Sequence, residues 1–200
     1  MKFAIYHKSK KFNWSVDNIF LISFVALLII YGLVNIIFGT ENYFSQKILP
    51  VILLGGLFVS LITRFLGFFK IEKASGILKG FISFNDDSIE VDNIEYNLED
   101  IKRIEISNED YRGKLSNLHG FGAALSNGTD NYIVLHFIAG KSKKYNFEMI
   151  DSNDFQKIRI QLIKYHIKSK IDFWSLAHIL GEKSPEETSE LTNEIKKHYC

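Results

Sequence analysis

Two long apolar runs near the start of the chain constrain its fold more than any other feature. The first covers residues 19–38, twenty consecutive residues without a charged side chain. A helix rises about 1.5 Å per residue, so this run measures about 30 Å, the thickness of the hydrocarbon core of a bilayer. The second covers residues 48–69 and contains one charge, Arg64. The sequence therefore predicts a hairpin of two transmembrane helices over residues 19–70.

The distribution of lysines predicts the orientation of this hairpin. The intervening loop, residues 39–47, carries Glu41 and Lys47. The outer flanks are richer in lysine: Lys2, Lys8, Lys10, Lys11, Lys70, Lys73 and Lys79. The positive-inside rule then places both termini in the cytoplasm of a multi-pass protein of the inner (cytoplasmic) membrane. A cleaved signal peptide is the competing interpretation of the first run, but the run is too long and no small-residue cleavage site follows it.

Composition and charge limit the remaining possibilities. The formal net charge of +1 gives no electrostatic basis for binding nucleic acid. Cys200 is the only cysteine, so no internal disulfide can form. Abundant Ile, Lys and Asn with two Pro are typical of an AT-rich bacterial gene. The expected organisation is a cytoplasmic leader (1–18), the hairpin (19–70), a cytoplasmic domain (71–170) that folds on its own, and a helical C-terminal tail (171–200).

Beyond the hairpin, apolar residues first alternate as in strands and then recur at helical spacing. The turn residues 85–87 separate two alternating runs, which predicts a first hairpin over 76–92. Further strands are expected at 95–98, at 101–106 with a register break near Ile101, at 132–138 and at 143–149. Helices are expected at 155–167, 173–181 and 185–197. The last begins with a Ser184 capping box, is polar nearly all round, and should fray or bind a partner.

This order of elements resembles bacterial membrane proteins with two N-terminal transmembrane helices and a cytoplasmic pleckstrin-homology-like (PH-like) domain. The segments that carry the resemblance are GFISFNDDSIEVDN, YNLEDIKRIEI, SNGTDNYIVLHF and the helix at 155–167. The resemblance implies a bent antiparallel barrel capped by a C-terminal helix. The expected fold class is thus a membrane α-hairpin, an α+β (mainly β) domain and a short helical tail.

The sequence shows little that could support catalysis. The acidic pairs 86–87 and 109–110 are interpreted as turn and loop residues. His136 lies in an apolar strand, where a core or edge histidine is favoured over a ligand. None of the histidines has metal-ligand spacing to another: His7, His119, His136, His166, His178 and His198. We therefore expect no catalytic, metal-binding or cofactor-binding residue, no cofactor, and no enzymatic activity.

The segment 109–131 is longer than an ordinary connection and is the candidate binding loop. Its candidate contact residues are Tyr111, Arg112, Lys114, His119 and Phe121, with the two cations facing an anion and Phe121 inserting into a partner or lipid. The alternative is a plain connection with a turn at 126–130.

Lys141, Lys143 and Lys144 form the candidate lipid-facing hairpin. A solvated hairpin tip is the alternative. The first hairpin turn, Asn85-Asp86-Asp87, has the wrong sign for a phosphate, which argues against lipid recognition of the kind that the resemblance suggests.

In the second apolar run, Gly55, Gly56 and Ser60 would let another helix approach closely. The expected neighbour is the first run, through Ala26 or Gly32, with a second molecule as the alternative.

These features together predict a membrane-tethered, non-enzymatic binding or assembly module. Its expected partners are the lipid bilayer and a protein partner or a second copy of the chain, without nucleic acid. The alternative function is a membrane-surface sensor of anionic lipid. A component of an enzyme or transporter complex is a weaker third class, because the sequence lacks clustered histidines, clustered carboxylates and charges deep in the apolar runs.

Overall fold

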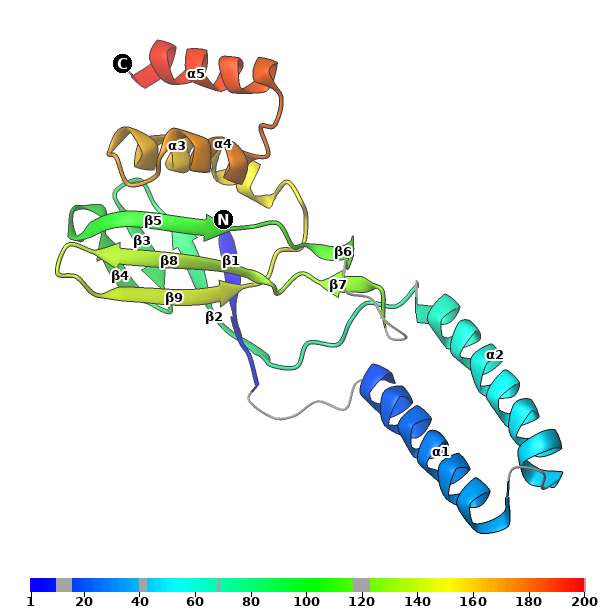
Figure 1. The fold of residues 1–200 in the computed structure, drawn as a ribbon. Coiled ribbons are helices and arrows are strands. Elements are labelled where there is room, and N and C mark those ends of the chain that lie inside the picture. Colours follow the sequence, from blue (N-terminus) through cyan, green and yellow to red (C-terminus); the bar gives the residue numbers. More distant parts are fainter. Residues whose placement is uncertain (10–15, 40–42, 68, 117–122, 200) are drawn as a thin grey trace. The chain divides into compact units, whose positions relative to one another are not determined.

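The computed structural model describes residues 1–9, 16–39, 43–67, 69–116 and 123–199 (Figure 1). The chain forms two compact units. The sheet unit comprises residues 1–9, 74–114 and 127–200, and the hairpin unit comprises residues 10–73 and 115–126. We describe each unit by itself.

The sheet unit is built on one seven-stranded antiparallel sheet with the order β4-β3-β2-β1-β9-β8-β5. Its strands are β1 (Lys2–His7), β2 (Ile77–Phe84), β3 (Ser88–Val91), β4 (Ile94–Asn97), β5 (Ile101–Ser107), β8 (Asn131–Phe137) and β9 (Ser142–Phe147). Two short strands, β6 (Arg112–Leu115) and β7 (Leu125–Asn127), pair with each other. The six strands predicted from alternation are confirmed, and so is the register break near Ile101, which lies between Ile101 and Arg103.

β1 was not predicted, because its six residues belong to the segment that we interpreted as a leader. Its side chains Phe3 and Ile5 are buried, and the strand pairs with β2 on one side and β9 on the other. In the order of the chain, the two apolar helices therefore come between β1 and β2, which are adjacent strands of the sheet. It follows that the acidic turn at 85–87 joins β2 to β3 and closes the second hairpin, not the first.

The sheet is open, so the expectation of a closed barrel is wrong. Closure of a barrel would require the edge strands β4 and β5 to pair. The free edge of β5 is instead bonded to Lys170, because the Ile104 amide donates to Lys170 O (2.8 Å) and Lys170 Nζ donates to Ile101 O (2.6 Å). The sheet nevertheless curves strongly. Tyr96 of β4 reaches across to β8 and β9, with its ring 5.4 Å from that of Phe137 and its hydroxyl 3.1 Å from that of Tyr145.

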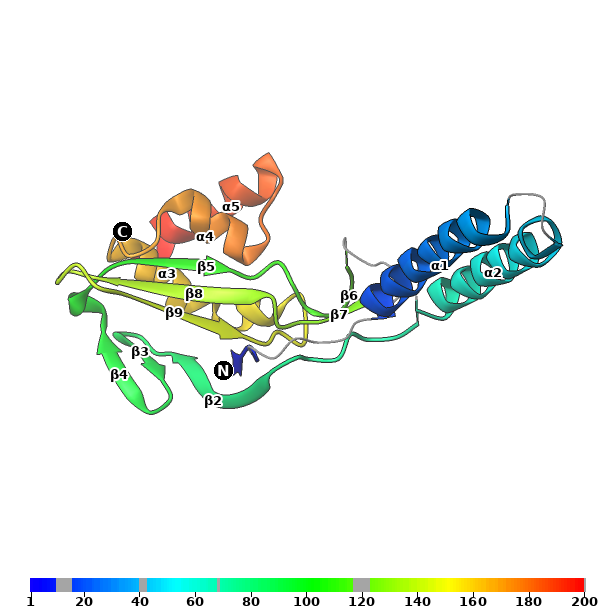
Figure 2. The same cartoon turned by 60° about the horizontal axis from the view of Figure 1, so that its bottom comes forward.

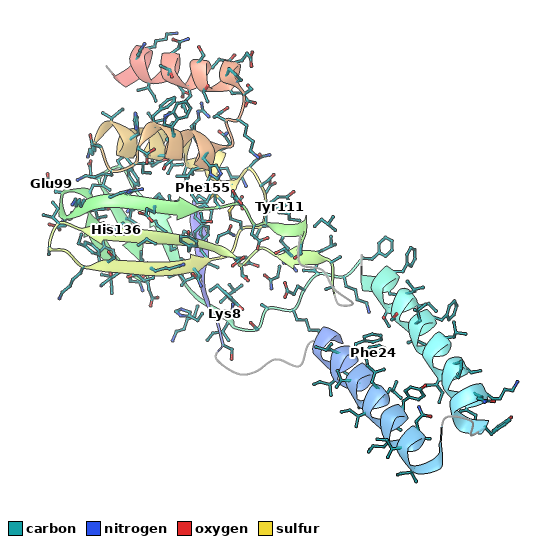
Figure 3. All side chains as sticks on the ribbon, in the orientation of Figure 1. Lys8, Phe24, Glu99, Tyr111, His136 and Phe155 are labelled. Carbon is teal, nitrogen blue, oxygen red and sulfur yellow. The ribbon has the colours of Figure 1, made fainter. Side chains whose placement is uncertain are left out.

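The sheet unit also contains the helical elements η2 (Leu98–Asp100), η3 (Asp154–Ile158), α3 (Arg159–Ile167), α4 (Phe173–Leu180) and α5 (Pro185–Tyr199). η3 and α3 pack on the concave side of the sheet. Phe155, labelled in Figure 3, packs its ring against Phe3, Phe84 and Phe147 at centroid distances of 4.8, 6.0 and 5.8 Å. One η3 side chain thus joins three strands of the core.

α5 packs on the unit instead of fraying. The Ser184 capping box is confirmed, because the Glu187 amide donates to Ser184 Oγ and the Ser184 amide donates to Glu187 Oε2. Leu191 and Ile195, which lie one helical turn apart, are buried although the helix is largely polar. Arg159 of α3 forms an ion pair with Glu194 of α5 (2.8 Å). α3 and α4 therefore lie between the sheet and α5 (Figure 1).

The hairpin unit contains α1 (Val16–Phe38), η1 (Phe44–Ile48) and α2 (Leu49–Gly67). Figures 1 and 2 show α1 and α2 running antiparallel beside each other. By length and composition, Ile19–Ile37 and Gln46–Gly67 are long and apolar enough to cross a membrane. Most of their described apolar side chains are exposed, which distinguishes them from core helices of a globular domain.

Candidate functional site

The base of the candidate binding loop is closed by the side chain of Asn131. Asn131 is 1% exposed, its Oδ1 accepts from the Asp110 amide (2.9 Å), and its Nδ2 donates to Asp110 O (2.7 Å) and Gly128 O (2.9 Å). Asp110 Oδ2 in turn accepts from the Asp130 amide (3.0 Å). Three of these hydrogen bonds join the two ends of the loop, and the fourth lies within its returning end; we call the set the Asn131 clamp.

The described contact residues of this loop do not converge on one anion. Tyr111 packs against the core, Arg112 is exposed, and Lys114 Nζ donates to the backbone oxygen of Glu109 (Tyr111 is labelled in Figure 3). His119 and Phe121 lie outside the described residues. The loop as a recognition element therefore stays a prediction.

The returning half of the loop belongs to the hairpin unit, where it bonds to the chain that follows α2. The Ala124 amide donates to Gly67 O (2.9 Å), the Leu125 amide donates to Lys70 O (3.1 Å), and the Glu72 amide donates to Leu125 O (2.7 Å). Residue 124 thus satisfies a carbonyl at the C-terminal end of α2 that has no partner within the helix. Sequence reasoning missed this contact, because its two segments are more than fifty residues apart.

The three lysines of the candidate lipid-facing hairpin do not form one basic cluster. Alternation along β9 sends Lys143 and Lys144 to opposite faces of the sheet. Lys143 Nζ donates to the Tyr96 hydroxyl (2.9 Å), whereas Lys144 Nζ lies 3.7 Å from the centroid of the Tyr132 ring. Lys141 is exposed in the turn between β8 and β9.

The paired tyrosines beside Lys143 differ in acidity. Burial raises the pKa of Tyr96, but hydrogen bonds with Lys143 and Tyr145 outweigh it and leave the pKa below its usual value. Burial, followed by the hydrogen bond with Tyr96, raises the pKa of Tyr145. The Lys143 ammonium is thus held on the concave face by the Tyr96 hydroxyl, so we do not count it among the cations available to a ligand.

A cavity opens where β1 and β9 separate. The two strands pair at Ile5–Phe147 and Tyr6–Asn146, and beyond that point an open cavity of about 580 Å³ lies between them. Its lining contains two lysines and a histidine but no carboxylate; Lys8 is labelled in Figure 3. The lining residues are Ile5, Tyr6, His7, Lys8, Lys144, Tyr145 and Asn146. Of these, only Lys144 was singled out from the sequence as a binding residue.

The acidic turn between β2 and β3 is neutralised by one lysine of α3 and one lysine directly after it. Lys164 Nζ lies 2.5 Å from Asp86 Oδ2, and Lys168 forms an ion pair with Asp87. The hydrogen bond from Lys168 holds the pKa of Asp87 below its usual value. From the sequence, we counted these carboxylates against phosphate binding because we placed them in the first hairpin turn. They lie in the second hairpin turn instead, and each is paired with a lysine.

His136 takes part in a Ser–His–Glu chain of contacts across three strands. Its Nδ1 lies 2.8 Å from Ser142 Oγ, and its Nε2 lies 3.2 Å from Glu105 Oε1. These residues do not line the cavity between β1 and β9. Among the described residues, no group of three or more His, Cys, Asp or Glu could hold a metal ion. We interpret His136 as a hydrogen-bonded surface histidine of the sheet.

The predicted helix-packing residues lie in α2, where the two glycines have open space around them. A Cβ built on Gly55, Gly56 or Gly32 meets no described atom within 4 Å. Ser60 is buried, and its hydroxyl donates to Leu57 O one turn earlier (2.7 Å). Close packing through these small residues, against α1 or a second molecule, stays a prediction.

Comparison of the chain with models of protein families, with curated proteins and with solved structures finds no match in any of the three.

Proposed function

We propose that this chain is a membrane-tethered, non-enzymatic binding module, in which two transmembrane helices hold a PH-like domain at the cytoplasmic face of the inner membrane. The observation that carries the proposal is the insertion of both apolar helices between β1 and β2. Because these strands are neighbours in the sheet, the domain would be joined to the bilayer by two covalent connections, which leave it at the paired end of β1 and start of β2. Such a tether limits how the domain can turn and selects the surface that it presents.

The order of elements supports the PH-like assignment. Nine strands precede α3, and seven of them form one antiparallel sheet in which the first four, β1 to β4, are adjacent in chain order. α3 and η3 pack against the concave side, as expected for the helix that caps a PH-like sheet. A fold of this kind hosts many functions, so the binding role rests on the tether and the surfaces.

Two partner classes remain open for this module. A protein partner or a second copy is supported by the candidate binding loop, whose ends are held rigidly by the Asn131 clamp. The alternative, recognition of anionic lipid, gains support from the cavity between β1 and β9, which carries cations without carboxylates. It also gains from the neutralisation of the acidic turn by Lys164 and Lys168.

Labelling of single cysteines tests the tether. Cys200 is the only cysteine, so a Cys200→Ser background allows one new cysteine at a time. In intact cells, a membrane-impermeant maleimide is expected to label Asn42→Cys, between the apolar helices, and to leave Ser169→Cys unlabelled until the membrane is opened. Labelling of Ser169→Cys in intact cells, or extraction of the chain from membranes at alkaline pH, would overturn the proposal.

Photo-crosslinking in native membranes separates the two partner classes. A crosslinking amino acid at the exposed Arg112 is expected to yield a discrete protein adduct if the loop holds a protein. A matched position on the exposed face of α5, Lys196, serves as the control, because it is charged and distant in sequence from the loop. Adducts of equal yield from both positions would show random collision and contradict a protein site at the loop.

A further inference from the structure

The cavity between β1 and β9 is built by the divergence of two strands that are paired further along. After Tyr6–Asn146 the pairing ends, so residues 7 and 8 of one strand lie across the cavity from residues 144 and 145 of the other. Its volume of about 580 Å³ falls in the range of roughly 300–1,000 Å³ typical of small-molecule sites. Ile5 and Tyr6, which are buried, line the cavity together with Lys8 and Lys144, so its lining combines apolar and cationic residues.

The charges of the rim favour a small anion. Lys8 and Lys144 come from opposite walls, and none of the lining residues is acidic. Among the described residues, neither lysine forms an ion pair with a carboxylate. The contact of Lys144 with the Tyr132 ring orients the ammonium but does not neutralise it. A phosphate group between the two ammonium groups would receive hydrogen bonds from both sides.

The covalent connections of the sheet unit indicate the source of such a phosphate. The chain leaves β1 through Lys8 and Ser9 and re-enters at β2, where Ile77 pairs with His7. The cavity therefore lies at the end of β1 from which both connections to the apolar helices depart. Ten residues lie between Lys8 and residue 19, where the first apolar run begins, so this stretch of chain spans at most about 40 Å when fully extended. Headgroups around that helix are within reach.

Exposed apolar residues beside the cavity fit a bilayer surface. Ile77 is 63% exposed and Leu78 is 47% exposed, and Lys79 follows them directly. Apolar side chains next to lysines suit the boundary between headgroups and acyl chains, where both can be satisfied. A site for a freely diffusing phosphate compound would not need this apolar margin.

We propose that the cavity between β1 and β9 binds the phosphate of an anionic phospholipid headgroup, held between Lys8 and Lys144. This proposal rests on the membrane tether proposed above and names a ligand for it. It departs from the sequence-based expectation in one respect, because Lys144 acts with Lys8 of the N-terminal strand and not with Lys141 and Lys143.

Binding of short-chain lipids to the full chain in a neutral detergent tests this site. We expect dihexanoyl phosphatidylglycerol to bind saturably, with dihexanoyl phosphatidylcholine and inorganic phosphate binding at least tenfold more weakly. Each lysine near an anionic group contributes roughly 1 kcal/mol, so the Lys8→Gln/Lys144→Gln variant should bind phosphatidylglycerol about thirty-fold more weakly. The matched variant Lys102→Gln/Lys196→Gln carries the same change of charge outside the cavity and should bind like the unmodified chain.

Three results would overturn the proposal. Equal losses in both double variants would show that attraction is spread over the whole protein. Inorganic phosphate binding as tightly as phosphatidylglycerol would assign the cavity to a soluble phosphate compound. Unchanged binding in Lys8→Gln/Lys144→Gln would place the lipid elsewhere. Because the assay is done in detergent, its failure is distinguishable from failure of the tether, which the cysteine labelling measures separately.

Discussion

Deletion of residues 2–7 is expected to abolish folding of the sheet unit. These residues form β1, which lies between β2 and β9. Its removal would therefore divide the sheet into two parts. The deletion also removes Phe3, Ile5 and Tyr6, which are 2%, 3% and 7% exposed. Burial of three such side chains contributes about 5–8 kcal/mol, which is comparable to the whole stability of a typical domain of about 5–15 kcal/mol.

Limited proteolysis of the full chain in membranes measures this loss. The unmodified chain should give a resistant fragment that contains β2 to α5, and the deletion variant should give none. Two point variants on the same strand provide a graded comparison. Phe3→Ala should cost about 3–5 kcal/mol, because it leaves a cavity among Phe84, Phe147 and Phe155, whereas Lys2→Ala, on the exposed side, should be near neutral. A resistant fragment of unchanged size in the deletion variant would show that β1 is dispensable.

β1 also shows why the sequence predicted most of the sheet but not its centre. The six confirmed strands can be recognised in the sequence from alternation and from nearby turns. One such turn is Asp92-Asn93 between β3 and β4, where both residues take positive φ. β1 alternates too, with Phe3 and Ile5 inward, but its partners lie near Ser83 and Phe147. No local turn points to pairing over such distances, and a short segment between lysines ahead of an apolar run is more easily taken for a leader.

The same reason explains which parts of the candidate site were missed. Lys144 was singled out because it stands in a local group of lysines. The neighbouring sequence of Lys8, in contrast, assigns this residue to the flank of a transmembrane helix. Only the pairing of β1 with β9 brings them to one cavity. Conversely, the sequence overestimates the acidic turn as an obstacle to phosphate binding, because its neutralisation by Lys164 and Lys168 depends on contacts about eighty residues apart.

α5 illustrates a second limit, which concerns amphipathicity. Two apolar residues, Leu191 and Ile195, are enough to dock this helix because Arg159 adds ion pairs to Glu194 and to Glu182 just before the helix. The pattern of apolar residues alone therefore underestimates how well such a helix packs on the rest of the domain. The sheet unit accordingly extends beyond residues 71–170 at both ends, and a fragment limited to that range would lack both β1 and α5.

The Asn131 clamp gives the second large expected effect. Replacement of Asn131 by Leu keeps a side chain of similar volume in a buried position but removes the groups that bond to the Asp110 amide, Asp110 O and Gly128 O. Each buried polar group left without a partner costs about 1–3 kcal/mol, so the variant should lose about 3–5 kcal/mol. Gly128 O still accepts from the Met149 amide (2.8 Å), so the loss falls mainly on the backbone amide and carbonyl of Asp110.

Hydrogen exchange of the full chain in detergent locates the effect as well as its size. In Asn131→Leu, amides of β8 and of the segment that follows Asp110 should exchange at least a hundredfold faster, whereas α4 and α5 should change less. Asn97→Leu is the matched control, because Asn97 is exposed and its side chain does not cap the turn that follows it. Equal exchange in both variants would show that the loop ends are held by the strands alone. Faster exchange confined to Asn131→Leu, together with loss of crosslinks from Arg112, would link the rigidity of the clamp to presentation of the loop.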